Sequence, residues 1–271
     1  LEISSLKDAR LDAIEDQIAV FRARQAVSSR YPGQPVATNS DPTVDPIDDP
    51  ILKRLSDRLA ASQQNHTPFR YRFARGLLDE STYEAMSNSL PDPNTVDWGR
   101  NPRYPDRGPI KFDGSWGNDD WKSLVDALTS QEFVDLATKL LEAEDLRAAL
   151  EKADCILSPT VKVTVDRENY YLGPHRDHVS RFASLLIYMP KDNSTCELGT
   201  SLYRPIVPMH PRDHGKHHSF EQFEKLETFP FLPNSGVLFL NFGDAYHGVQ
   251  PVHHALRPMI QSSIYIKKTH R

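Results

Sequence analysis

The spacing of hydrophobic residues divides the chain into a helical first part and a strand-rich second part. Apolar residues recur every three to four positions between residues 50 and 153, which predicts helices over 50–61, 79–90, 118–128, 130–141 and 147–153. After them the pattern becomes β-branched and alternating, which predicts strands over 156–165, 182–189, 198–203, 236–242 and 259–267. Helices followed by a run of short strands are typical of an α+β fold whose strands close into a sandwich.

Residues 1–50 differ from the rest of the chain. A narrow apolar stripe predicts a helix over residues 3–27, and a proline- and aspartate-rich tract, residues 31–50, follows it as a linker. We therefore predict an N-terminal arm over 1–50 and a single domain over 51–271, with a helical part (51–153) and a strand-rich part (154–271). The helix over residues 3–27 has two interpretations, a homo-oligomer or partner contact and a helix that lies across its own domain.

Composition and charge narrow the class of protein. A chain of 271 residues can bury one large core, and its net charge of −5 without a sustained basic run argues against a nucleic-acid binder. A short strand predicted over residues 69–73 alternates aromatic and basic side chains, but the acidic chain around it argues against an RNA surface. Two cysteines form no disulfide framework, and no apolar run approaches the roughly 18–20 residues that span a bilayer. These features predict a soluble, cytoplasmic protein.

Candidate metal ligands lie in the stretch 170–178. His175 and Asp177 are two residues apart, so on an extended chain their side chains point to the same face. A third ligand has to come from elsewhere, and His247 is the candidate. Two histidines and one carboxylate suit non-haem Fe(II) and leave coordination positions open. Ten residues after His247, Arg257 begins a predicted strand, where its guanidinium would suit an anionic co-substrate because it pairs with a carboxylate through two hydrogen bonds.

The chain holds eleven histidines, so its sequence offers other possible metal sites. Residues 210–218 contain four of them, but proline, glycine and charged neighbours indicate a flexible insert whose imidazoles are solvated. The order of elements around His175, Asp177 and His247, each beside a predicted strand or turn, favours these three residues instead.

The order His-x-Asp, distant His and Arg resembles the Fe(II)/2-oxoglutarate-dependent oxygenases, over about residues 156–266. The resemblance implies a double-stranded β-helix (jelly-roll) core in the C-terminal half, with the N-terminal helices buttressing its larger sheet. It implies that His175, Asp177 and His247 hold the iron and that Arg257 anchors the distal carboxylate of 2-oxoglutarate. The expected activity is hydroxylation of an unactivated C–H with O2, releasing succinate and CO2. The family often has a serine two residues after its arginine, whereas this chain has Met259.

The alternation along the last predicted strand assigns its faces. Ile260, Ile264 and Ile266 are expected to pack beneath the helices, while Arg257 and the residues that alternate with it face the interior of the barrel. A charge on an interior face is costly without a partner, so a carboxylate ligand would account for Arg257.

Further site residues are predicted on the same basis. Tyr171 and Ser263 are candidates for binding 2-oxoglutarate, and Tyr203, Arg204 and Arg176 are candidates for binding the primary substrate. We expect the loops 91–117 and 205–230 to lie at the mouth of the site, with 205–230 as a mobile insert. The sequence of neither loop identifies the substrate, so a small molecule, a carrier-bound group and a glycan all remain possible substrates.

Two other classes of protein remain open. One is a cupin-like metal-binding barrel without redox activity, either an isomerase or a sensor, which needs no Arg257. The other is an interaction module in which residues 1–50 act and the barrel is a scaffold. If the family resemblance holds, the presence of Asp177 favours hydroxylation over halogenation, whereas desaturation and cyclisation stay open.

Overall fold

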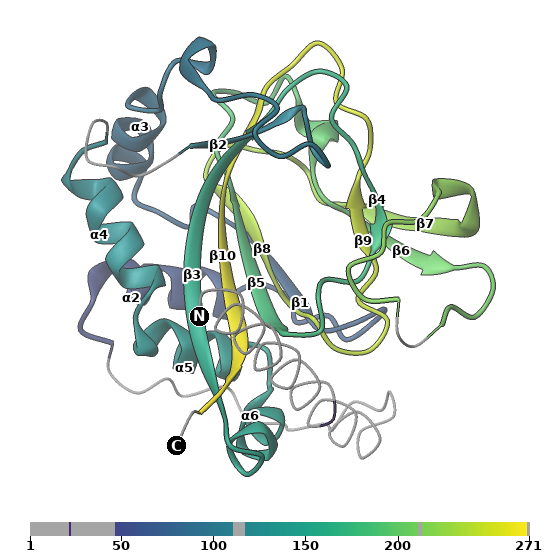
Figure 1. Ribbon diagram of the computed structural model, residues 1–271. Coiled ribbons are helices and arrows are strands. Elements are labelled where there is room, and N and C mark those ends of the chain that lie inside the picture. Colours follow the sequence, from purple (N-terminus) through teal and green to yellow (C-terminus); the bar gives the residue numbers. More distant parts are fainter. Residues whose placement is uncertain (1–21, 23–46, 111–116, 211–212, 270–271) are drawn as a thin grey trace, which may run out of the picture.

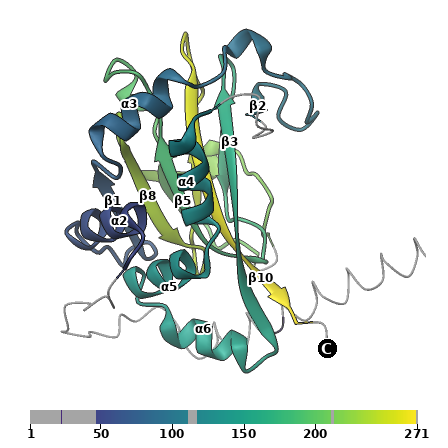
Figure 2. The same ribbon diagram turned by 90° about the vertical axis from the view of Figure 1, so that its left-hand side faces the viewer.

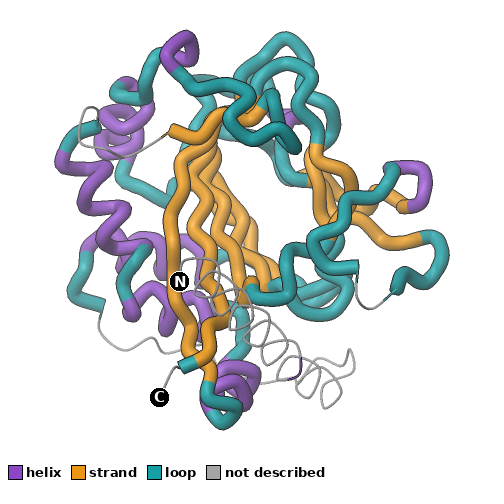
Figure 3. Tube along the Cα trace, viewed as in Figure 1, coloured by secondary structure: helices purple, strands orange, loops and turns teal. Residues whose placement is uncertain are grey.

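Two antiparallel sheets face each other in the computed structural model, which describes residue 22 and residues 47–110, 117–210 and 213–269 (Figure 1). The larger sheet contains, in spatial order, β1 (Tyr71–Arg75), β8 (Ser235–Leu240), β5 (Arg181–Tyr188), β10 (Arg257–Lys268), β3 (Cys155–Asp166) and β2 (Arg107–Ile110). The smaller sheet contains β4 (Leu172–His175), β9 (His247–Val249), β6 (Ser201–Pro205) and β7 (Phe223–Thr228). Figure 3 shows the two groups of strands in orange, joined by loops at their ends.

The chain passes back and forth between the two sheets. From β3 to β6 successive strands alternate between the larger and the smaller sheet, β7 stays beside β6, and β8, β9 and β10 alternate again. All described pairings between neighbouring strands are antiparallel. This is the double-stranded β-helix, so the predicted jelly-roll is confirmed.

Helices cover the outer face of the larger sheet (Figure 2). They are α2 (Pro50–Ala60), α3 (Glu80–Asn88), α4 (Asp119–Leu128), α5 (Gln131–Leu140) and α6 (Glu144–Glu151), with short 3-10 turns at η1 (Pro93–Thr95), η2 (Cys196–Leu198) and η3 (Phe220–Gln222). Side chains of Asp49, Asn118 and Ser130 cap α2, α4 and α5 by accepting hydrogen bonds from first-turn amides. The apolar faces of these helices share one buried cluster with the larger sheet, which confirms the predicted buttress.

The last strand divides its side chains between two cores, as predicted. Ile260, Ile264 and Ile266 belong to the cluster beneath the helices. Met259 packs with Tyr188 in a second cluster between the sheets, and it follows the fully buried Arg257 by two residues. The alternation therefore places Arg257 inside the barrel.

Arg72 connects a strand to the ends of two helices. Its buried guanidinium donates hydrogen bonds to the backbone oxygens of Leu59, Ala60 and Ser62 at the end of α2 and of Leu140 at the end of α5. Arg72, one of the two basic residues in the predicted aromatic–basic strand, therefore caps helix ends, because carbonyls at a helix C-terminus have no partner within the helix.

Arg72→Ala is expected to lower the free energy of unfolding by about 3 kcal/mol, because it removes a buried side chain and the donor that the backbone oxygens of Ala60, Ser62 and Leu140 share. Urea denaturation followed by circular dichroism measures this loss. Arg75→Ala on the same strand, where the side chain is exposed, should change stability by less than about 0.5 kcal/mol. Equal losses in the two variants would contradict the capping role.

Some predicted segments contain structure that the sequence pattern did not reveal. The loop predicted over 91–117 holds β2, and the insert predicted over 205–230 holds β7. Both are edge strands, and the exposed charged residues of β7 mask its alternation. The helix predicted over 3–27 and the linker over 31–50 lie almost wholly outside the described residues, so the predicted division at residue 50 stays a prediction. Among the helices that are described, none has the length and apolar character needed to cross a bilayer.

Candidate metal centre

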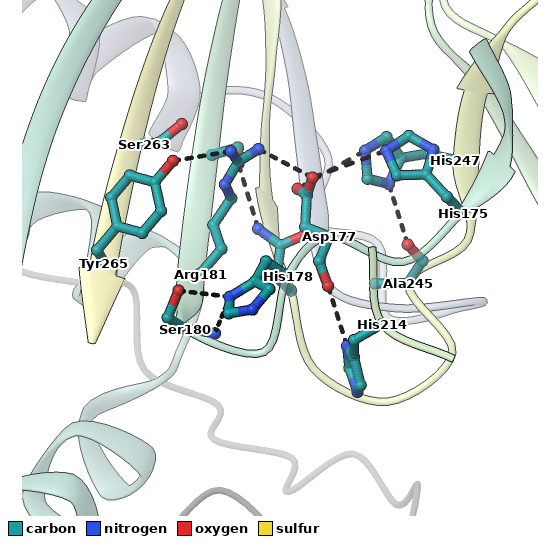
Figure 4. A network of polar contacts seen from close by, with 12 residues as sticks. His175, Asp177, His178, Ser180, Arg181, His214, Ala245, His247, Ser263 and Tyr265 are labelled. Carbon is teal, nitrogen blue, oxygen red and sulfur yellow. Dashed lines mark hydrogen bonds and ion pairs between the residues drawn. The ribbon is translucent and has the colours of Figure 1, made fainter. Parts of the chain in front are cut away.

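His175, Asp177 and His247 meet between the two sheets. His175 ends β4, His247 begins β9, and the two residues are paired across neighbouring strands of the smaller sheet. Asp177 follows β4 by two residues, and its side chain lies beside both imidazoles (Figure 4). All three residues are buried, and one ligand atom from each lies within 4.8 Å of the others. The structure brings together the three ligands that the sequence predicted.

Hydrogen bonds orient both imidazoles toward the same point. The Nδ1 of His175 lies 3.0 Å from the backbone oxygen of Gly173, and the Nδ1 of His247 lies 3.0 Å from that of Ala245. Because a carbonyl only accepts, each Nδ1 carries a proton, so the lone pair of the neutral imidazole is on Nε2, the atom that faces Asp177. Both Nε2 atoms lie 3.7 Å from an oxygen of Asp177, and ligands of one metal ion are about 3–4 Å apart when each lies about 2 Å from it.

The charges at the site favour the protonation states that bind a metal. Burial alone would raise the pKa of the Asp177 carboxyl, but Arg181, His247 and His175 together hold that pKa well below its usual range. Burial, assisted by His175, lowers the pKa of His247 to about 4, so this imidazole is neutral at neutral pH. Asp177 Oδ2 is buried and has no hydrogen-bond partner among the described residues. A divalent cation fits this donor set, because it would satisfy the carboxylate and both lone pairs at once.

The histidine-rich segment packs against the metal ligands, contrary to the expectation of a solvated insert. The amides of Gly215 and His218 donate to the backbone oxygens of Arg176 and Pro174, and His214 Nδ1 donates to that of Asp177. Residues 213–218 thus pack along residues 174–177, which include two of the three ligands. Gly173 permits this approach, because a Cβ there would lie 2.2 Å from the backbone oxygen of His218.

His217 and Tyr104 are neighbours of the metal ligands that the sequence did not identify. The His217 ring centroid lies 4.6 Å from that of His175, and its Nε2 is 3.1 Å from the Tyr104 hydroxyl. Burial, with contributions from His175, Arg103 and His247, lowers the pKa of His217 to about 3 and keeps it neutral. Tyr104 belongs to the loop 91–117, so part of that loop does lie beside the metal ligands. The sequence carried no signal for this pair, because the two residues are separated by more than one hundred positions.

Arg257 has a carboxylate partner within the protein. Its guanidinium donates to Asp166 Oδ2 at 2.9 Å and to the backbone oxygen of Leu198, and neither member of the ion pair is exposed. Arg107 donates to both oxygens of the same carboxylate, at 2.6 and 2.9 Å. This buried group holds two guanidinium ions and one carboxylate, so it carries one excess positive charge.

Two hydroxyl groups near Arg257 are buried and have no hydrogen-bond partner among the described residues. They are the hydroxyls of Tyr170 and Thr164. Burial raises the pKa of Tyr170, which stays a donor, and the charges of Arg107, Asp166 and Arg257 also act on it. Thr164 is paired with Met259 across β3 and β10, where the family often has its serine hydroxyl.

The other predicted co-substrate ligands lie in different settings. Ser263 is buried on the strand that carries Arg257. Tyr171 is 61% exposed and its ring lies 6.5 Å from that of Phe220, whereas its neighbour Tyr170 is buried and its pKa is affected by the charge of Arg257. The roles proposed for Tyr171 and Ser263 stay predictions.

Of the three residues predicted for the primary substrate, Tyr203 and Arg176 share Tyr246 as a neighbour, whereas Arg204 lies on the surface. Tyr203 is buried in a small aromatic cluster that includes Tyr246, and Arg204 is exposed and paired with Glu224. Arg176 is buried against the ring of Tyr246 and donates to the backbone oxygen of His210, next to the metal ligands in sequence. The structure does not bring these three side chains together at His175, Asp177 and His247, and their proposed roles stay predictions.

Comparisons with known proteins found matches among solved structures alone. No family model and no curated protein sequence matches the chain. The chain is similar to a prolyl-4-hydroxylase from Pseudomonas putida, with 13% identity and a TM-score of 0.43 over 81% of this chain and 100% of that one. It is also similar to SnoN, a non-haem α-ketoglutarate-dependent epimerase from nogalamycin biosynthesis, with 12% identity and a TM-score of 0.44 over 79% and 80% of the chains. A third match is a prolyl hydroxylase from Trichoplax adhaerens, with 14% identity and a TM-score of 0.44 over 83% and 96%. Identities this low assign no activity, so the function depends on the side chains described above.

Proposed function

We propose that this protein is an Fe(II)- and 2-oxoglutarate-dependent dioxygenase that hydroxylates an unactivated C–H bond. The buried cluster of His175, Asp177 and His247 carries the proposal, because it presents three oriented donors to one point. Two histidines and one carboxylate on one side of a cation leave its other positions for co-substrate and O2. When bound, Fe(II) with 2-oxoglutarate and O2 supplies the oxidising chemistry and releases succinate and CO2.

The buried arginine group supports a dicarboxylate co-substrate. Arg257 and Arg107 share the single carboxylate of Asp166, and the excess positive charge has no further described counter-ion in the group. The hydroxyl of Tyr170, whose ring lies beside Arg107, and that of Thr164, two residues before Asp166 on β3, have no hydrogen-bond partner among the described residues. A carboxylate that enters here would gain a guanidinium and up to two hydroxyl groups, and it would balance the charge.

Residues around the proposed metal site orient its ligands and pack against the segment that carries them. Backbone carbonyls hold His175 and His247 with a proton on Nδ1, and residues 213–218 pack against the segment that carries His175 and Asp177. Tyr104 and His217 bring neutral hydrogen-bonding groups beside the metal ligands, where they can contact a substrate. A small molecule, a carrier-bound group and a glycan are all compatible with these contacts.

A cupin-like barrel that binds metal without redox chemistry is the second candidate. One observation favours it: Asp166 already neutralises Arg257, so the buried guanidinium does not require a co-substrate. The excess charge from Arg107, and the hydroxyls of Tyr170 and Thr164 that have no partner within the described ranges, weigh against this candidate.

Spectroscopy under anaerobic conditions tests the proposal. Adding 2-oxoglutarate to the Fe(II)-loaded protein is expected to produce a weak visible metal-to-ligand charge-transfer band, and admitting air should yield succinate. His175→Ala should lose both signals. A protein that binds Fe(II) but shows neither the band nor succinate would support the non-redox barrel.

A further inference from the structure

Arg181 lies between the metal ligands and the larger sheet. It begins β5, four residues after Asp177, and its NH1 donates to Asp177 Oδ1 at 2.9 Å. Its NH2 donates to the Tyr265 hydroxyl, also at 2.9 Å, so the guanidinium bridges β10 and the ligand carboxylate (Figure 4). The Arg181 side chain is 15% exposed and that of Asp177 is 9% exposed, so water competes little for this contact.

Without Arg181 the two oxygens of Asp177 would be nearly equivalent toward a metal ion. Oδ1 lies 3.7 Å from His175 Nε2, and Oδ2 lies 3.7 Å from His247 Nε2. A carboxylate placed in this way can bind a cation through one oxygen or through both. Binding through both would fill one of the positions that the proposed reaction needs.

The guanidinium makes the two oxygens different. Oδ1 accepts the hydrogen bond from Arg181, whereas Oδ2 has no partner among the described residues. We propose that Arg181 is a positioning residue that holds Asp177 as a one-oxygen ligand and so keeps an adjacent coordination position open. The proposal concerns the metal centre, and only its consequence for 2-oxoglutarate depends on the proposed function.

The charge of Arg181 and its hydrogen bond to Asp177 predict different effects on metal binding, so an experiment can separate them. Arg181 is positive and close to the cation site, so its removal reduces repulsion and should leave divalent-metal affinity equal or higher. Loss of the hydrogen bond from Arg181 should at the same time let the Asp177 carboxylate turn and bind the metal through both oxygens. A lysine keeps the charge but offers a point donor in place of a planar fork, so it should restore the geometry only in part.

The first measurement uses Mn(II) alone, with the full chain. Electron paramagnetic resonance in ¹⁷O-labelled water counts the exchangeable water ligands of bound Mn(II). Arg181→Gln is expected to hold about one water fewer than the wild type while binding Mn(II) at least as tightly. Arg147→Gln is the matched control, because Arg147 also pairs with acidic side chains but lies on α6, among the helices that cover the outer face of the larger sheet. It should match the wild type.

The second measurement titrates 2-oxoglutarate into the anaerobic Fe(II) form. A keto acid that chelates iron needs two adjacent positions, so Arg181→Gln should weaken its binding by roughly ten-fold or more. If the wild type fails to bind 2-oxoglutarate, the proposed function is wrong, but the Mn(II) water count still tests Arg181.

An unchanged water count in folded Arg181→Gln would overturn the proposal and leave Arg181 a structural counter-ion. If Arg181→Gln does not fold, Arg181→Lys and Tyr265→Phe replace it. Tyr265→Phe removes the hydroxyl that steadies the guanidinium without changing any charge. A partial loss of water in either variant supports the proposal, and wild-type counts in both overturn it.

Discussion

Asp177→Ala is expected to reduce Fe(II) affinity by at least about three orders of magnitude, the largest effect of any single change in this protein. Asp177 is the only anionic ligand in the buried cluster, and structural zinc sites, taken for scale, bind with free energies of about 10–16 kcal/mol shared among their ligands. Losing about 4 kcal/mol therefore corresponds to roughly a thousand-fold. Isothermal titration under anaerobic conditions measures the change.

The same substitution should also destabilise the fold. Arg181 would remain largely buried without the carboxylate that its NH1 contacts, and breaking such a pair typically costs about 3–5 kcal/mol. Asp177→Asn separates the two effects, since its amide oxygen can still accept from Arg181 while its charge is lost. His178→Ala is the control, because His178 is an exposed neighbour with its ring nitrogen bonded to Ser180. An Asp177→Ala variant that binds Fe(II) as tightly as the wild type would contradict the assignment of Asp177 as a metal ligand.

Local geometry explains why the metal ligands were predictable from the sequence. On an extended chain, residues two apart share a face, so the spacing of His175 and Asp177 was enough to place them together. His247 required the fold, because it joins the site through strand pairing between β4 and β9. The order of predicted strands supplied that information indirectly, through the family resemblance.

Residues that act through long-range contacts were not predictable. The alternation along β10 put Arg257 inside the barrel, and the cost of a buried charge required a partner. The structure provides Asp166, ninety-one positions earlier, and Arg107 beside it. Nothing in the local sequence of Arg257 or Arg181 distinguishes a guanidinium with an internal partner from one that awaits a ligand.

The histidine-rich segment was predicted to be solvated, but its described residues pack against the metal ligands. Its proline, glycine and charged residues indicated a solvated loop, yet Gly215 and His218 make backbone hydrogen bonds to the ligand strand. Composition reports which conformations a segment prefers by itself. It does not report that β4 lies at the edge of its sheet and offers unpaired backbone groups to a neighbouring segment.

Arg257→Ala is expected to weaken 2-oxoglutarate binding by about two to three orders of magnitude. If Arg257 holds the distal carboxylate, the variant loses a charge-assisted pair in a buried setting, which typically costs about 3–5 kcal/mol. Arg257→Lys should recover part of the affinity, since a point charge replaces a fork. Fe(II) affinity should change little, because the three ligands are untouched. Titration of 2-oxoglutarate into the Fe(II) form measures the affinity for the co-substrate, with succinate as a second readout. A separate Fe(II) titration measures the metal affinity.

The internal partner of Arg257 makes a second variant necessary. Arg257→Ala leaves Asp166 with Arg107 alone, so a loss of stability could imitate a loss of binding. Tyr170→Phe avoids this, because it removes a hydroxyl for which the described part of the chain offers no partner and leaves both ion pairs in place. If that hydroxyl donates to the co-substrate carboxylate, its removal should weaken 2-oxoglutarate binding about ten-fold without lowering stability, since a hydrogen bond to a charged group contributes about 1.5–3 kcal/mol. Wild-type affinity in both Arg257→Ala and Tyr170→Phe would move the carboxylate away from this pocket and favour the barrel that binds metal without a keto acid.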